Sequence, residues 1–189
     1  MLNRTIPPIA GPLVHRPLPA FERTSLTNGI PVYILPYGTV EVAEVQIIFK
    51  AGKAFQDKVG LSSYTARMLS EGTENYTSKQ LAEKLDDHGS WVHHDMGAEF
   101  VSINLTSLVD ELEATLPVLH EVVCNPVFPE SEFTKLKQRD LQSLEVQQQK
   151  TATLARRAFG HGTYGPMHPF GMNLSPDELG LLELADIKG

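Results

Sequence analysis

Histidines are the side chains best suited to chemistry in this 189-residue chain, which contains seven of them. His93 and His94 are adjacent, and His161 lies close to His168. Adjacent residues of a strand point to opposite faces, so the first pair is poorly placed to bind one ion. Glycines and a proline leave the geometry of the second pair unspecified. We therefore interpret these residues as ordinary surface or hydrogen-bonded histidines, and His88 as a cation near a helix C-terminus.

Nucleophilic catalysis finds no support in the residue pattern. The single cysteine, Cys124, lies in an apolar run and is expected to be a small buried side chain, and one cysteine excludes a disulfide within the chain. No serine lies in a G-x-S-x-G elbow. The sequence therefore argues against a serine or cysteine hydrolase.

Composition places the chain among ordinary globular proteins. It is 41% hydrophobic and 21% charged, and it is long enough to bury one sizeable core. The net charge of -7, with no run of Lys or Arg, argues against nucleic acid and anionic membranes as partners. Residues 1–20 are rich in proline and lack the apolar segment of a signal peptide, which predicts an extended arm or a mobile tail, and a cytoplasmic location.

The hydrophobic periodicity from residue 21 onward predicts an α+β fold. Three strands are followed by two helices, two more strands and then several helices. The strands are expected near 21–26, 30–36, 41–52, 90–96 and 99–105, and the helices near 59–73, 79–89, 111–124, 132–149, 153–160 and from 175 onward. This order favours a two-layer domain with an antiparallel or mixed sheet and helices on one face.

Three local features give sharper expectations. The uninterrupted apolar run Ile47-Ile48-Phe49 favours a central strand that is deeply packed. Pro117 predicts a kink or an early stop in its helix. The segment 161–171 is too rich in Gly and Pro for regular structure.

Several sequence blocks occur in the order found in the pitrilysin, insulinase and mitochondrial processing peptidase family. They are LTNGIPVYIL, VQIIFKAG, VGLSSYTARMLSEGT, TSKQLAEKLDDHGS, NPVFPESEF and YGPMHPFG. Over residues 21 to about 187 the chain resembles the first domain of these zinc metallopeptidases. The resemblance implies the metallohydrolase fold of the processing peptidases.

In active members of that family the first helix carries His-x-x-Glu-His, an inverted zinc motif. Two histidines four residues apart bind one zinc ion from one helix face, and the glutamate activates the metal-bound water. Aligning Gly60-Leu61 and Met68-Leu69 with that motif places Ser63, Ala66 and Arg67 at its three positions. Arg67 has no lone pair for zinc, and Ala66 has no group that takes a proton.

The third zinc ligand of the family is a glutamate on a later helix. Counting back from the last block places Ser143 at that position, and a slip of two residues would place Glu145 there. One carboxylate without its histidines makes a poor zinc site. We therefore expect neither zinc nor a catalytic centre in this chain.

The resemblance also points to a peptide-binding strand. Family members add extended peptides to an edge strand, which corresponds to residues 90–96. The candidate residues are His93, His94, Asp95 and Met96, where the family commonly has Asn-Ala-x-Thr. The alternative is a merely solvated strand.

The degenerate motif predicts a non-catalytic partner or regulatory half of a zinc metallopeptidase that binds or processes peptides. A structural or assembly subunit with the same fold is one alternative, and a divergent metallopeptidase with an unrecognised metal site is another. The expected partner is a zinc-bearing homologue or second domain, in the same or another chain. Because domains of the family continue with further strands and a helix, we expect residues 21–189 to be a truncated first domain that self-associates through uncovered surface.

Overall fold

A computed structural model describes residues 20–189 except 36, 37 and 39. The expected proline-rich arm lies outside the described residues apart from Ala20. The chain divides into two compact units, residues 1–40 and 41–189, and each is described by itself.

The first unit contains a hairpin built from the first two expected strands. Strand β1 (Glu22–Ser25) pairs with β2 (Pro31–Ile34) in antiparallel register. At the turn, the Asn28 side chain accepts a hydrogen bond of 3.1 Å from the backbone N–H of Ile30. Gly29 adopts a φ of 86°, a left-handed conformation that glycine enters without a steric penalty. These two turn residues therefore set the register of the hairpin.

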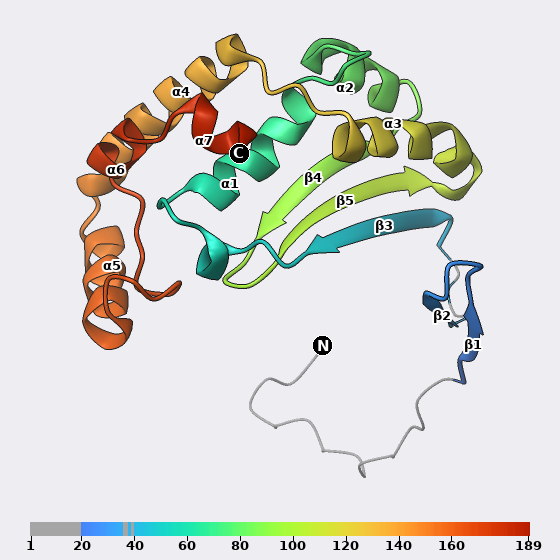
Figure 1. Ribbon diagram of the computed structural model, residues 1–189, viewed down its shortest axis with the longest axis horizontal. Coiled ribbons are helices and arrows are strands. Elements are labelled where there is room, and N and C mark those ends of the chain that lie inside the picture. The colour runs from blue at the N-terminus through green and yellow to red at the C-terminus, as the bar shows by residue number, and fades with distance from the viewer. Residues whose placement is uncertain (1–19, 36–37, 39) are drawn as a thin grey trace, which may run out of the picture. The chain divides into compact units, whose positions relative to one another are not determined.

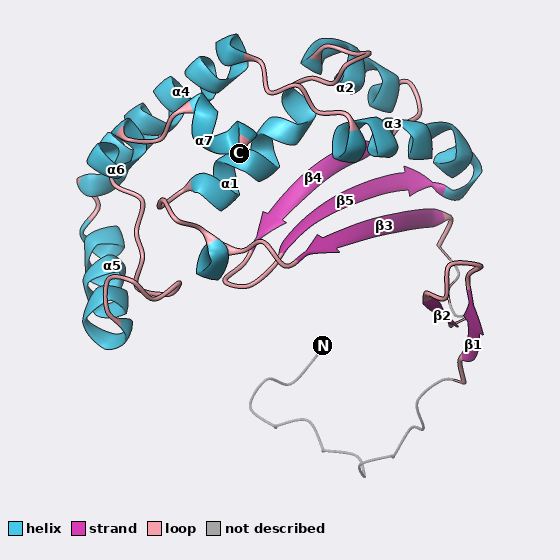
Figure 2. Ribbon diagram, in the orientation of Figure 1, coloured by secondary structure: helices cyan, strands magenta, loops and turns pink. Residues whose placement is uncertain are grey.

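The second unit has two layers, as Figures 1 and 2 show, and this arrangement confirms the α+β prediction. Its sheet contains β3 (Val42–Phe49), β4 (Trp91–Met96) and β5 (Val101–Leu108) in the order β3-β5-β4. Both pairings are antiparallel. Helices cover one face of this sheet.

Seven α-helices form the other layer and its extension. They are α1 (Leu61–Met68), α2 (Ser78–Asp86), α3 (Leu112–Cys124), α4 (Glu130–Gln148), α5 (Thr151–Tyr164), α6 (Pro176–Gly180) and α7 (Leu184–Lys188). Three short 3-10 turns, η1 (Lys53–Phe55), η2 (Leu69–Glu71) and η3 (Val109–Glu111), join these elements. Helix α6 begins with a reciprocal capping box between Ser175 and Glu178.

The hydrophobic core under the helices is built on alternate residues of the middle strand. Ile103 and Leu105 of β5 are fully buried, and they pack with Val45 and Ile47 of β3 against α2 and α3. The expectation that β3 is central was wrong within residues 41–189. There β3 pairs only with β5, and its Ile48, on the helix-free face, is 57% exposed.

A second core lies between α1, α4 and the last two helices. Its buried members are Tyr64, Met68, Phe133, Leu136, Leu144, Leu179, Leu182 and Ile187. Tyr64 and Met68 recur at helical spacing, so one face of α1 is committed to this core. Ser63 and Arg67, which directly precede these two residues, are two of the positions that the alignment in the sequence analysis assigns to the zinc motif.

Several local predictions differ from the structure. Helix α2 begins at Ser78 and ends at Asp86, not at 79 and 89, and its N-cap is Thr77, whose hydroxyl accepts from the Gln80 N–H in a capping box. Helix α3 continues through Pro117 to Cys124, so the early stop was wrong. Cys124 is exposed rather than buried, since it is the last residue of α3. Helix α5 extends through Tyr164, into the segment expected to be irregular.

Candidate functional site

Helix α1 places the three motif positions in different surroundings. Ala66 is buried, whereas Ser63 and Arg67 are partly exposed. Ala66 also lines a largely apolar cavity of about 420 Å³, whose wall includes Phe49, Phe55 and Leu69. The position of the family's general base therefore faces apolar side chains.

Arg67 is held by an acidic residue of α4. Its Nη1 donates to Oδ2 of Asp140 over 2.5 Å, and its Nη2 donates to Oδ1 over 3.1 Å. The Tyr64 hydroxyl donates to the same Oδ2 over 2.9 Å. The guanidinium also lies 5.4 Å from the centre of the Tyr64 ring. A two-point ion pair of this kind fixes geometry as well as charge, so the three residues join α1 to α4.

The charges of this cluster stabilise one another. Burial opposes ionisation of Asp140, but the hydrogen bonds from Arg67 and Tyr64 outweigh it and lower the pKa of the carboxyl. Burial and then the hydrogen bond to Asp140 raise the pKa of Tyr64. Asp140 is therefore a carboxylate that is already neutralised by its partners.

The candidate peptide-binding residues lie on an edge of the three-stranded sheet, because within residues 41–189 strand β4 pairs only with β5. His93 and His94 point to opposite faces, as expected. His94 Nε2 lies 3.1 Å from the Ser70 hydroxyl on the helix side, while His93 Nε2 lies 3.6 Å from Asp95 Oδ2 on the other face. Met96 is partly exposed at the strand end.

His94 is in surroundings that favour its neutral form. Burial lowers the pKa of its imidazole, and the nearby His93 and Arg67 lower it further. The arginine of the lost motif thus also influences the edge strand.

The helix-free face of the sheet carries a polar row that the sequence did not reveal. Asn104 of β5 is fully buried there, and its Nδ2 donates to Asp95 Oδ2 over 3.0 Å and to the Ser102 hydroxyl over 3.2 Å. His93 is the cross-strand neighbour of Asn104. In the described part of the chain, Asn104 Oδ1 and His93 Nδ1 are both buried without a hydrogen-bond partner. The row fixes the side chains of β4, and it brings no nucleophile together with a base.

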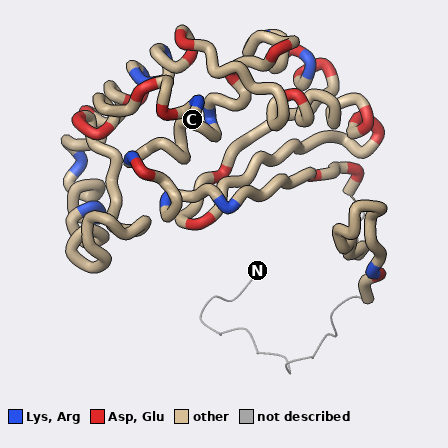
Figure 3. The backbone as a smooth tube through the Cα atoms, viewed as in Figure 1, with Lys and Arg blue, Asp and Glu red and all other residues tan. Residues whose placement is uncertain are grey.

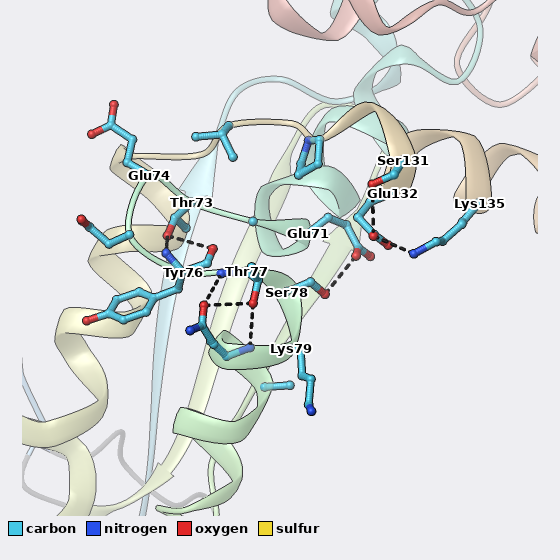
Figure 4. Close-up of a pocket in the computed structure, with 16 residues that line it drawn as sticks. Glu71, Thr73, Glu74, Tyr76, Thr77, Ser78, Lys79, Ser131, Glu132 and Lys135 are labelled. Carbon is cyan, nitrogen blue, oxygen red and sulfur yellow. Dashed lines mark hydrogen bonds and ion pairs between the residues drawn. The ribbon is translucent and has the colours of Figure 1, made fainter.

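A cavity of about 600 Å³, with many polar residues in its lining, lies beyond the end of α1. Figure 4 shows the residues that line it. Its polar side chains bond to each other, as the dashed lines mark: Glu71 accepts from the Ser78 hydroxyl, and Lys135 donates to Glu132. These groups already have partners within the chain, so the cavity offers no evident catalytic group.

Comparison with protein families shows which family this chain belongs to. The family model described as Insulinase (Peptidase family M16) matches residues 34–166. The chain belongs to the insulinase M16 peptidase family. An uncharacterized zinc protease of Rickettsia felis is 28% identical over 148 residues, which are 76% of this chain and 35% of that protein. A second one, from Rickettsia bellii, is 26% identical over the same shares.

Two solved structures share the fold. The inactive domain of an M16 peptidase from Pseudomonas fluorescens matches with a TM-score of 0.77 and 24% identity, covering 89% of this chain and 42% of that one. A protease from Helicobacter pylori matches with a TM-score of 0.74 and 20% identity, covering 90% and 42%. This M16 chain therefore spans well under half the length of the proteins it matches.

The donor set of this M16 chain does not fit the family's zinc ion. Arg67 presents a permanent cation that is bound to Asp140, and Ala66 carries no base. Ser143 is exposed on α4, where its hydroxyl accepts from Gln147, and Glu145 is exposed as well. Over the residues that the structure describes, no three His, Cys, Asp or Glu side chains gather as a metal site would require.

Two residues of the α1–α4 cluster escaped the sequence analysis. Tyr64 recurs with Met68 at the spacing of a core face, and Asp140 is one of several acidic residues in a polar helix, so neither stands out in the sequence. The available signal was that Arg67, placed on a half-buried helix, needs a carboxylate partner.

Among the remaining candidate residues, His88 lies apart from this cluster and pairs with Glu111 at 2.7 Å. Among the described residues, no helix is both long enough and apolar enough to cross a bilayer.

Proposed function

We propose that this chain is a non-catalytic half of an M16 zinc peptidase assembly. The observation that carries the proposal is the pair of Arg67 with Asp140. In the helix where active members bind zinc, this chain has a cation that is held in place by a carboxylate and a tyrosine hydroxyl. Salt-bridged residues that link α1 to α4 have a structural role there.

Loss of the general base supports the same proposal independently. A metal-bound water needs a nearby group that accepts its proton, and Ala66 offers none. The Pseudomonas fluorescens neighbour is an inactive domain of an M16 peptidase, which agrees with this role. The Rickettsia relatives are described as zinc proteases, but this chain covers 35% of each.

The proposed partner is a zinc-bearing M16 homologue or second domain. Such a partner would supply the ligands and the base, and this chain would supply binding surface or regulate access. The edge strand β4 is the surface we propose for an extended peptide, since one of its edges is unpaired within residues 41–189. His93, His94, Asp95 and Met96 would set its side-chain preference.

The test of the proposal uses the tagged full-length protein in its native cells. We expect affinity purification to recover a zinc-bearing M16 homologue and a peptidase activity that falls when this subunit is removed. Chelation should abolish that activity. Hydrolysis by the purified chain alone, sensitive to chelators, would favour the divergent metallopeptidase. Recovery with only non-peptidase subunits would favour the structural role.

The role of β4 has its own measurement. Hydrogen exchange of the β4 amides should slow when an unstructured peptide, the oxidised insulin B chain, is added to the purified protein. The β5 amides, which are already paired on both sides, serve as the internal control. Equal protection, or none, in both strands would count against peptide addition at this edge.

A further inference from the structure

Helix α5 carries apolar and aromatic side chains that the rest of its unit leaves uncovered. The helix has no buried residue along its whole length. Phe159 is 71% exposed, and Met167 and Phe170 of the following loop are 80% and 62% exposed. Helices in proteins are stabilised chiefly by burial of an apolar face, so an exposed helix of this composition is a candidate interaction surface.

The loop after α5 is firmly built, although its tip is exposed. The Tyr164 ring stacks on His168 at 5.1 Å and meets Phe170 edge-on at 5.5 Å. The backbone N–H groups of Gly171 and Met172 both donate to the His168 carbonyl over 2.8 Å. These contacts hold the aromatic side chains in place before any partner arrives, which lowers the entropy lost on binding.

Glycine makes the close approach of this loop to the helix feasible. A Cβ at Gly160 would lie 2.8 Å from the Phe170 carbonyl oxygen, and one at Gly171 would lie 1.9 Å from that of Gly165. The loop is therefore packed directly on the helix backbone. Arg156 and Arg157 lie about one helical turn before Gly160, the residue on which the loop packs.

The charge of this region is opposite to that of the chain. Residues 146–176 contain Lys150, Arg156 and Arg157 and no Asp or Glu, although the chain has 23 acidic residues and a net charge of -7. Figure 3 shows the same segregation, with blue but no red over α5 and its loop. A surface that joins positive charge to exposed aromatic groups is complementary to an acidic partner that also has apolar side chains.

We propose that this surface, comprising Arg156, Arg157, Phe159, Tyr164, Met167 and Phe170, binds an acidic amphipathic segment of a partner protein. The apolar side chains of the segment cover Phe159, Met167 and Phe170, and its carboxylates pair with the two arginines. The proposal does not depend on the peptidase role, because the surface is separate from the Arg67 cluster and from β4.

The test measures binding of labelled helical peptides to the full chain by fluorescence anisotropy. The probes are an amphipathic Leu/Glu peptide and its Leu/Lys and Leu/Gln counterparts. We expect the Leu/Glu peptide to bind at least about tenfold more tightly than either counterpart, since opposite charges steer and fix the contact. Raising the salt concentration should weaken its binding. Equal binding of all three peptides, or none, would overturn the proposal.

Variants separate the two parts of the surface. Arg156→Glu/Arg157→Glu and Phe159→Ser/Met167→Ser should each weaken Leu/Glu binding by about tenfold or more. The control Lys53→Glu/Lys188→Glu makes the same charge change at exposed sites elsewhere and should leave affinity within about twofold. Because Arg157 donates to Gln147 at 3.4 Å, Arg156→Glu alone is included to keep the helix intact. Equal losses in the control and the arginine variants would contradict a local site.

Further measurements on the same proteins test two other ligands for the α5 surface. Binding to phosphatidylserine vesicles without binding to the Leu/Glu peptide would replace the protein partner by a membrane. Self-association in light scattering that Arg156→Glu/Arg157→Glu abolishes would replace it by a second copy of this chain. Either result would overturn the assignment to an acidic segment of a different protein.

Discussion

Arg67 of α1 and Asp140 of α4 form a two-point ion pair at 2.5 and 3.1 Å. Their side chains are 27% and 19% exposed, so water screens the pair less than a surface salt bridge. In active M16 members, zinc joins the helix of the inverted motif to a later helix. In this chain an ion pair connects α1 to α4.

A double-mutant cycle should reveal this connection as a stability contribution. Arg67→Met or Asp140→Leu alone should each reduce the free energy of unfolding by about 1–3 kcal/mol, because each leaves a partly buried charge unpaired. The double variant should lose less than the sum of the two. Urea unfolding of the four proteins measures the coupling.

The exposed pair of Lys79 and Glu83 provides the matched control. Its atoms lie 3.5 Å apart on the surface of α2, and such pairs contribute about 0.3–0.5 kcal/mol. If the Arg67–Asp140 coupling is no larger than that of the control, the pair does not join the helices in any energetic sense.

The same pair predicts how stability depends on acid pH. The pKa of Asp140 is lower in the folded chain than its unfolded value of about 3.9. The contribution of the ionised Asp140 to the free energy of unfolding is therefore complete above about pH 4, and it is lost as the pH falls through the folded pKa. Subtracting the unfolding free energy of Asp140→Asn from that of the wild type isolates the effect from other carboxyls. A flat difference between about pH 2 and pH 5 would contradict the linkage.

Much of this fold follows from local signals that survive in the final structure. The alternation of apolar and polar residues on β5 and the helical spacing on α1 both reflect an apolar face that packs into a core, so the sequence pattern predicts them directly. The Asn28-Gly29 turn and the Ser175 cap are recognisable because their side chains bond to nearby backbone. These local contacts explain why the α+β prediction was confirmed.

The features that the sequence did not predict depend on contacts between segments far apart in the chain. The edge position of β3 depends on which strands pair, and an apolar run such as Ile47-Ile48-Phe49 does not specify its neighbours. The motif positions on α1 could be counted in sequence, but the meeting of Arg67 with Asp140 joins residues 73 positions apart. The unpartnered Asn104 Oδ1 is equally invisible before β4 and β5 are aligned.

His94 predicts a second pH effect, at milder acidity. Burial and the neighbouring His93 and Arg67 lower its pKa below the ordinary value of about 6.5. Its contribution to stability is therefore present above about pH 6.5 and is lost as the pH falls through the folded pKa. His94→Gln should flatten the stability curve of the wild type in that window. NMR titration of the ring gives the direct check, and a pKa at or above the ordinary value would contradict this account.

Restoring the zinc ligands tests the alignment of α1 and α4 with the family. The variant Ser63→His, Ala66→Glu, Arg67→His and Ser143→Glu should gain a stoichiometric, chelator-reversible zinc site, measured by calorimetry and metal analysis. Asp140→Asn is added because removal of Arg67 would leave that carboxylate unpaired. The wild-type chain, treated identically, is the reference.

A companion variant decides which residue of α4 faces the restored histidines. It keeps Asp140 and Ser143 and changes only the three α1 positions. We expect weaker zinc binding here, since the family alignment assigns the third ligand to Ser143, one turn beyond Asp140. Equal binding would mean that Asp140 itself serves as the ligand and that the alignment of α4 is displaced by one turn. If neither variant binds zinc, the alignment of α1 is wrong or the site has closed around the ion pair.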